Sequence, residues 1–170
     1  MKYADYLCDG LKFEDNYTHC YFVAGGNIMH LLNAVRARFV CIPVVNEVAA
    51  GIAAEYFNET NKNGYKAFAL VTAGPGLTNI VTAIAGAYLE SRELLVIGGQ
   101  VKRADLKSSG LRQRGIQEID GRSIVEPITN HSVLVREKLK YDEIHKILHE
   151  KLKPGPIFLE VPLDVQAEPV

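Results

Sequence analysis

The feature that most constrains the fold is a series of short apolar runs, rich in β-branched and aromatic residues, with helical stretches between most of them. The runs span residues 18–23, 39–45, 66–72, 94–98, 131–135 and 157–161. Their apolarity is continuous rather than alternating, which is typical of strands buried on both faces. Helical stretches are predicted at 2–13, 27–36, 47–62, 76–90 and 139–152. This alternation predicts an α/β fold of three layers, α/β/α, around a mostly parallel six-stranded sheet.

Size and composition narrow the class of protein further. The 170 residues have the length of one domain, so we expect a single domain over residues 1–170. The net charge of −1 argues against nucleic acid or an anionic membrane as the main partner. Three cysteines without C-x-x-C spacing predict reduced thiols. The polar N-terminus is not typical of a signal peptide, and the apolar runs fall short of the about 20 residues of a membrane helix. We therefore expect a cytoplasmic soluble domain.

Residues 100–125 break the strand–helix alternation. They are polar and dotted with glycine, which predicts a long loop with a short helix possible from 117 to 125. A loop of this length in a compact domain is usually functional or disordered.

Unusual short sequences follow directly after four of the predicted strands. They are Ala24-Gly25-Gly26-Asn27, Asn46-Glu47, Thr72-Ala73-Gly74-Pro75-Gly76 and Gly98-Gly99-Gln100. In open parallel sheets, ligands bind beyond the carboxyl ends of the strands. We therefore expect these four turns to form one site at one edge of the sheet.

The stretch VTAGPGLTN, residues 71–79, is compatible with two interpretations. Glycines 74 and 76 allow the backbone to approach a ligand closely, and the following helix directs its N-terminus at that ligand. Alternatively, it is a tight strand-to-helix turn capped by Thr72 or Thr78. It matches neither a Walker motif nor a full dinucleotide fingerprint. Asn27, after its own glycine pair, is similarly compatible with a helix N-cap.

Two groups of titratable residues also have alternative interpretations. Glu47 has apolar sequence neighbours on nearly every side, and a carboxyl in an apolar pocket relays protons near neutrality because its pKa is raised. An acid in the first turn of a helix is also favoured by the macrodipole alone. His145 and His149 have the i, i+4 spacing of metal ligands, but no third ligand is apparent. We therefore predict a solvated helix face and no metal site within the chain.

Taken in order, these motifs resemble the pyrimidine-binding domain of thiamine-diphosphate enzymes, most closely the acetolactate synthase-like branch. The family pattern is a glycine-pair turn, a lone Glu before an Ala/Gly-rich helix, T-x-G-P-G-x-x-N, a strand ending in G-Q-V, and a Q-E pair. Here these are Gly25-Gly26, Glu47, Thr72 to Gly76 with Asn79, Gly99-Gln100-Val101, and Gln117-Glu118. The closing stretch 154–166 resembles the usual end of this domain, so the resemblance covers nearly the whole chain.

The resemblance implies a role for each matching residue. Glu47 is the catalytic acid that hydrogen-bonds the aminopyrimidine of thiamine diphosphate and thereby promotes loss of the C2 proton of its thiazolium. The cofactor-binding residues are Thr72, Gly74, Pro75, Gly76 and Asn79. The substrate-side residues are Gly25, Gly26, Asn27, Gln100 and Gln117. The implied reaction is decarboxylation or ligation of a small 2-oxo acid, with the cofactor as electron sink.

The sequence departs from the family pattern in ways that bear on substrate and completeness. Ile116 stands where acetolactate synthases usually have Phe, and the tract 111–115 also differs, so the 2-oxo acid is left open. The G-D-G…N motif that holds the diphosphate and Mg²⁺ in the family is missing, because Ile119-Asp120-Gly121 lacks the first glycine. We therefore expect a fragment of a larger enzyme or one subunit of a split enzyme of the sulfopyruvate decarboxylase type.

Three further expectations follow from the half-complete motif set. Mg²⁺ would be held by a diphosphate-binding domain in a partner or in a missing part of the chain, and the isolated chain would be inactive. An apolar face left for partners predicts a homodimer. A non-catalytic α/β module that binds a nucleotide or phosphate at Gly74–Gly76 is the alternative function.

Overall fold

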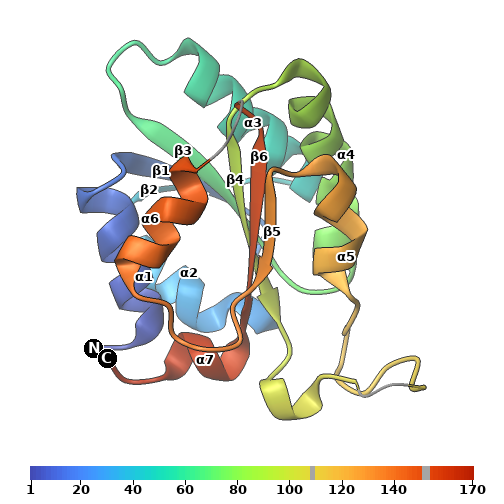
Figure 1. Cartoon of the computed structure of the whole chain (residues 1–170). Coiled ribbons are helices and arrows are strands. Elements are labelled where there is room, and N and C mark those ends of the chain that lie inside the picture. Colours follow the sequence, from blue (N-terminus) through green and yellow to red (C-terminus); the bar gives the residue numbers. More distant parts are fainter. Residues whose placement is uncertain (108–109, 151–153) are drawn as a thin grey trace.

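A parallel six-stranded sheet forms the centre of the molecule (Figure 1). The computed structural model describes residues 1–107, 110–150 and 154–170. The strands are β1 (Tyr17–Phe22), β2 (Val40–Pro43), β3 (Lys66–Val71), β4 (Leu94–Gln100), β5 (His131–Leu134) and β6 (Pro156–Pro162). Their order in the sheet is β2-β1-β3-β4-β6-β5, and every neighbouring pair is parallel. All six predicted strands and the predicted fold class are thereby confirmed.

Two adjacent interior strands, β4 and β6, are the most buried part of the sheet, as their continuous apolar runs predict. Strands β4 and β6 pair in register from Leu94 opposite Pro156 to Gln100 opposite Pro162. Every residue of both strands is buried. Because both faces of these strands are covered by helices, their side chains are apolar apart from the buried Gln100 and Glu160.

The helices cover the two faces of the sheet and make two separate cores. One core contains side chains of α1 (Tyr3–Phe13), α2 (Met29–Arg36), α6 (Tyr141–His149) and α7 (Leu163–Ala167). The other contains side chains of α3 (Glu47–Thr60), α4 (Pro75–Glu90) and α5 (Gly121–Val125). Short 3₁₀ turns η1 (Gly26–Ile28), η2 (Arg103–Asp105) and η3 (Glu126–Ile128) complete the elements of the described residues. The result is the predicted α/β/α layering.

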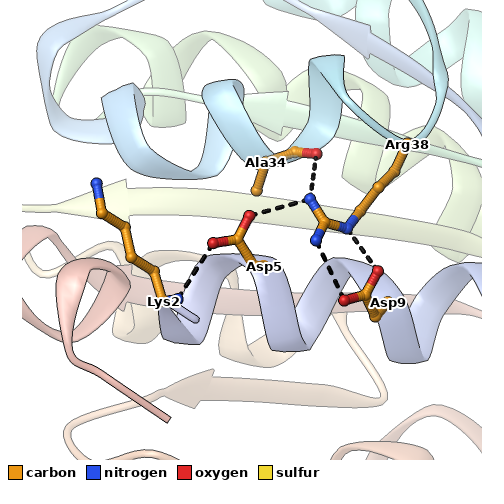
Figure 2. A network of polar contacts seen from close by, with 5 residues as sticks. All are labelled: Lys2, Asp5, Asp9, Ala34 and Arg38. Atoms are coloured by element: carbon orange, nitrogen blue, oxygen red, sulfur yellow. Dashed lines mark hydrogen bonds and ion pairs between the residues drawn. The ribbon is translucent and has the colours of Figure 1, made fainter.

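An ion-pair network joins α1 to the end of α2 (Figure 2). The guanidinium of Arg38 donates two hydrogen bonds to Asp9, at 2.6 and 3.1 Å, and a third to Asp5 at 3.0 Å. It also donates to the backbone carbonyl of Ala34. The forked contact with Asp9 is the geometry in which arginine binds carboxylates most strongly. The network thus fixes how the two helices pack beside each other on one face of the sheet.

Two predicted helices have other bounds in the structure, and one helix of the structure was not predicted. The helix predicted at 139–152 runs over Tyr141–His149, and residues 151 and 152 of that prediction lie outside the described residues. The short helix predicted at 117–125 is limited to Gly121–Val125, because Asp120 caps it by accepting a hydrogen bond from the Ser123 backbone. Helix α7 was not predicted. In the described part of the chain, no helix has the length and apolarity to cross a membrane.

Candidate functional site

Turns after β1, β2 and β3 meet at the carboxyl edge of the sheet, around Thr72. A Cβ atom placed on Gly25 would lie 2.4 Å from the Cβ of Thr72. A Cβ on Gly76 would lie 2.9 Å from Thr72 Cγ2 and 3.3 Å from the Oε1 atom of Glu47. Only glycine leaves room for these approaches, so the sequence-predicted residues Gly25, Thr72, Gly76 and Glu47 are brought together.

Thr72 carries a polar atom that the protein does not satisfy. Its Oγ1 atom is buried and has no hydrogen-bond partner among the residues that the structure describes. A buried hydroxyl without a partner costs free energy, so each such group in a native structure calls for an explanation. A ligand that hydrogen-bonds Thr72 at this point is one explanation.

Glu47 is the first residue of α3 and is positioned by two asparagines. Asn46 caps the helix, because its side chain accepts a hydrogen bond of 2.9 Å from the backbone N–H of Ala49. Asn79, on α4, donates a hydrogen bond of 2.6 Å from its Nδ2 atom to Glu47 Oε2. The side chain is half-buried, so it is not enclosed by apolar neighbours as the sequence suggested. Asn79, predicted to bind the cofactor, contacts the Glu47 carboxylate directly.

Gly74 sits at the N-terminus of α4 in a conformation that other residues rarely adopt. Its φ and ψ are 64° and −118°, and it is the N-cap of the helix, with Pro75 in the first turn. No side chain caps this helix, so the interpretation of Thr72 or Thr78 as its cap is wrong. The backbone of Gly74 faces that of Gln117, whose own φ is 62°. Gly74, Pro75 and Gln117 therefore line one pocket, together with Arg112.

Gly26 and Asn27 follow Gly25 in the turn after β1. A Cβ on Gly99 of β4 would lie 2.1 Å from the carbonyl oxygen of Asn27. That oxygen accepts a hydrogen bond of 2.8 Å from Gln166, while Gly26 faces open space. Asn27 lies inside η1, and α2 begins at Met29 after Ile28, so the alternative of Asn27 as a helix N-cap is wrong.

Gln100, predicted on the substrate side, is buried, and its side-chain amide is hydrogen-bonded within the protein. Its Nε2 donates to the Ile119 carbonyl and to Glu160 Oε1, each at 2.9 Å, and its Oε1 accepts from the Val101 backbone. Glu160 lies among apolar residues of β6. Desolvation, assisted by the Asp120 carboxylate, raises the pKa of Glu160 to about 8. Gln100 and Glu160 line a pocket beside that of Gly74, and Ile119 lines both.

The sequence patterns missed the roles of two acids. Glu160 was visible as the one acid within the predicted strand 157–161, which is a signal for a functional or paired carboxyl. Glu118 is buried, and its carboxylate accepts backbone hydrogen bonds from Lys107, Arg114 and Gly115. Desolvation acts to raise the pKa of Glu118, yet these bonds hold it below its ordinary value. Glu118 thus organises the long loop that carries Gln117.

Comparison with known proteins identifies the family. The model of a family described as "Thiamine pyrophosphate enzyme, N-terminal TPP binding domain" matches residues 1–124. The chain belongs to this family.

Several acetolactate synthases are relatives of this thiamine pyrophosphate enzyme domain. That of Arthrospira platensis is 42% identical over 123 residues, which are 69% of this chain and 19% of the relative. The isozyme 1 large subunit of Escherichia coli K12 is 33% identical over 85% of this chain and 25% of its own length. Acetolactate synthase 1, chloroplastic, of Nicotiana tabacum is 28% identical over 98% of this chain and 25% of its own length. The chain therefore spans about a fifth to a quarter of the relatives it matches.

The residues of the site fit one part of thiamine diphosphate. The aminopyrimidine ring is flat and carries hydrogen-bonding nitrogens. The glycine cradle at Gly25, Gly74 and Gly76 adds no side chain of its own and packs against Thr72, Glu47 and Gln117. The Thr72 hydroxyl and the Glu47 carboxylate are the polar groups that would hydrogen-bond the ring. Carboxylate–phosphate repulsion would make the neighbourhood of Glu47 a poor place for the diphosphate. The fit is therefore to the pyrimidine end.

Proposed function

We propose that this chain supplies the pyrimidine-binding half of the active site of an acetolactate synthase-like, thiamine-diphosphate-dependent enzyme that decarboxylates or ligates 2-oxo acids. The observation that carries the proposal is the placement of the Glu47 carboxylate. It lies beside the glycine cradle and the unsatisfied Thr72 hydroxyl, at the edge where parallel sheets bind ligands.

Glu47 would hold and exchange the proton on which the chemistry depends. Asn79 donates to Oε2, which orients the carboxyl group and leaves Oε1 on the side of Gly76. From there Oε1 would hydrogen-bond a ring nitrogen of the pyrimidine and move a proton to or from it. When bound, thiamine diphosphate supplies the acidic carbon and the electron sink for the 2-oxo acid. Thr72 would orient the ring by a hydrogen bond from Oγ1.

The proposed site is half of a complete one. The groups for the diphosphate and Mg²⁺ would come from a diphosphate-binding domain in another part of the enzyme or in another subunit, and the isolated chain would be inactive. The relatives' greater length supports the first arrangement, since each is about four to five times as long as the matched segment. In the second arrangement, these groups would come from a separate partner subunit, as in the split decarboxylases. We further propose that residues 1–170 are one such domain, that it forms a homodimer and that it acts in the cytoplasm.

A phosphate- or nucleotide-binding module without carbanion chemistry is the competing function. Its support is Gly74 at the N-terminus of the 16-residue helix α4, where backbone N–H groups and the helix dipole favour anions. Glu47 separates the two functions, because an anion-binding site has no use for a carboxylate at this position.

The test is Glu47→Gln, made in this chain and combined with a diphosphate-binding domain of the same family. The measurement is hydrogen–deuterium exchange at C2 of thiamine diphosphate by NMR. We expect the exchange rate to fall at least about a hundredfold, because the amide cannot exchange a proton with the ring. Far-ultraviolet circular dichroism should be unchanged.

Glu59→Gln is the matched control. Glu59 lies on the same helix but is exposed near its far end, so its loss should leave the exchange rate as it is. Exchange that is equally fast in Glu47→Gln and in the unaltered chain would contradict the proposed role. Phosphate binding that survives in Glu47→Gln without any C2 exchange in either protein would favour the competing module.

A further inference from the structure

A cluster of metal-ligating side chains lies at the other edge of the sheet, away from the proposed site. Asp15 is in the turn between α1 and β1, and His145 and His149 are one turn apart on α6. The turn that holds Asp15 enters β1 at its amino end, whereas Glu47 and Thr72 follow the carboxyl ends of strands. We infer that these three residues form a binding site for a zinc-type divalent cation.

The three side chains converge on one point. The Nε2 atom of His149 lies 2.6 Å, and the Nδ1 atom of His145 lies 3.0 Å, from the same oxygen, Oδ1 of Asp15. One ligand atom from each residue lies within 4.8 Å of the other two. Ligands held about 2.0–2.1 Å from a tetrahedral Zn²⁺ are about 3.3 Å apart, so small side-chain rotations would admit the ion. The two imidazoles and the carboxylate are ligands that zinc commonly takes.

Asp15 is built into the protein as an oriented ligand. Its side chain is only 1% exposed, and its other oxygen, Oδ2, accepts a hydrogen bond from the hydroxyl of Tyr141. The ring of Tyr141 packs on Gly10 of α1, where a Cβ atom would lie 2.0 Å from it. Tyr141 is thus a positioning residue, since it holds the carboxylate with Oδ1 turned to the histidines. Such outer hydrogen bonds are the usual companions of metal ligands.

His145 supplies a second, independent observation. Although its Nδ1 is 3.0 Å from Asp15 Oδ1, the two atoms do not have hydrogen-bond geometry, and Nδ1 is a buried atom without a hydrogen-bond partner in the described part of the chain. A metal ion would use its lone pair. Both imidazole side chains are nearly half exposed, at 46% and 44%, so an ion can enter from solvent.

The site would take three protein ligands and leave a fourth position for water or another donor. Imidazole and carboxylate together favour Zn²⁺, Co²⁺, Ni²⁺ or Cu²⁺ over Mg²⁺ or Ca²⁺, which prefer oxygen ligands alone. Bound there, the ion would tie α6 to the turn after α1. We assign it a structural role, because the site lies at the opposite edge of the sheet from Glu47.

The test is titration of the full chain, freed of metal by a chelator, with Zn²⁺ in a calorimeter under reducing conditions. We expect saturable binding of one Zn²⁺ per chain. His145→Gln and His149→Gln should each weaken it at least about tenfold, and Tyr141→Phe should weaken it by roughly tenfold as a lost second-sphere contact. In the unaltered chain, Co²⁺ should give the visible absorption of a low-coordinate site, and each histidine variant should lose it.

Two control variants distinguish this site from other donors. His30→Gln removes a half-exposed histidine on α2, and Cys41→Ser removes a half-buried thiol whose pKa is raised by burial. Both should bind Zn²⁺ as the unaltered chain does. Absence of saturable binding, a loss of less than about tenfold in both histidine variants, or a loss in Cys41→Ser would overturn the inference. An unchanged affinity in Tyr141→Phe would overturn the positioning role of Tyr141.

Discussion

At the scale of single residues, Glu160 shows how the fold changes the chemistry of a side chain. It is buried on the interior strand β6, and its carboxyl accepts a hydrogen bond from Gln100. Burial and the Asp120 carboxylate raise its pKa to about 8, against an ordinary value near 4.5. At neutral pH the folded protein therefore holds a proton on Glu160 that the unfolded chain has released.

This difference predicts a pH dependence of stability. Between about pH 4.5 and 8 the native state binds more protons at Glu160 than the unfolded state, so the free energy of unfolding should fall as pH rises through this window. Glu160→Gln should remove that contribution, which is on the order of a few kcal/mol. The measurement is urea unfolding of both proteins at a series of pH values. Parallel curves would show that Glu160 does not carry the shift.

The sequence predicted which residues form the candidate site better than it predicted which of them contact each other. Glu47 and the glycines stand out because an acid among apolar neighbours and a Gly-Pro-Gly turn are rare and local in the sequence. The bond from Asn79 to Glu47 joins residues 32 positions apart on different helices, so no local pattern contains it. Asp15, the third ligand of the histidine pair, is 130 or more positions from both for the same reason.

At the scale of elements, helix α3 depends on its first turn. Its apolar face is made of small residues, and Gly51 lies so close to Ala83 of α4 that a Cβ there would be 2.4 Å away. Small side chains bury little area each, so the local bonds that begin the helix contribute a larger share of its stability. The cap made by Asn46 is the clearest of these bonds.

Asn46→Ala should lower the free energy of unfolding by about 1 kcal/mol, because the Ala49 N–H loses its acceptor. Asn46→Asp, which keeps an acceptor and suits the helix dipole, should stay close to the unaltered chain. Urea denaturation followed by circular dichroism compares the three. Equal midpoints for the alanine and aspartate variants would contradict the role of the cap.

Element boundaries also show what patterns can and cannot predict. The strands were predicted because continuous β-branched runs of five to seven residues have few other structures available to them. Helix α7 was missed because Leu163–Ala167 has only five residues and directly follows Pro162 of β6, so no helical period can develop. Tertiary contacts hold it: Val165 is in the core, and Gln166 bonds the carbonyls of Asn27 and Val161.

At the scale of the whole molecule, apolar side chains lie exposed on α3 and in the turn that precedes it. Val45, Ile52 and Tyr56 are 95%, 51% and 65% exposed, and Ile52 and Tyr56 are one helical turn apart. The same helix begins with Glu47, so a partner that covered these side chains would also lie near the candidate site. This supports the proposed self-association of the chain.

Sedimentation equilibrium of Ile52→Lys/Tyr56→Lys should therefore show a weaker dimer than that of the unaltered chain, with at least about a tenfold increase in the dissociation constant from loss of two apolar contacts. Phe13→Lys is the control, since Phe13 is equally exposed but lies on α1, on the other face of the sheet. A strictly monomeric mass for the unaltered chain at high concentration would refute self-association.

The two ends of the chain lie side by side (Figure 1). Lys2 and Pro169 form an antiparallel bridge, and the backbone of Val170 donates a hydrogen bond of 2.9 Å to the Met1 carbonyl. The first and last residues are therefore adjacent and hydrogen-bonded to each other. Polypeptide that flanked the domain on both sides would therefore leave it from the same point on its surface. It would not need to cross either face of the sheet.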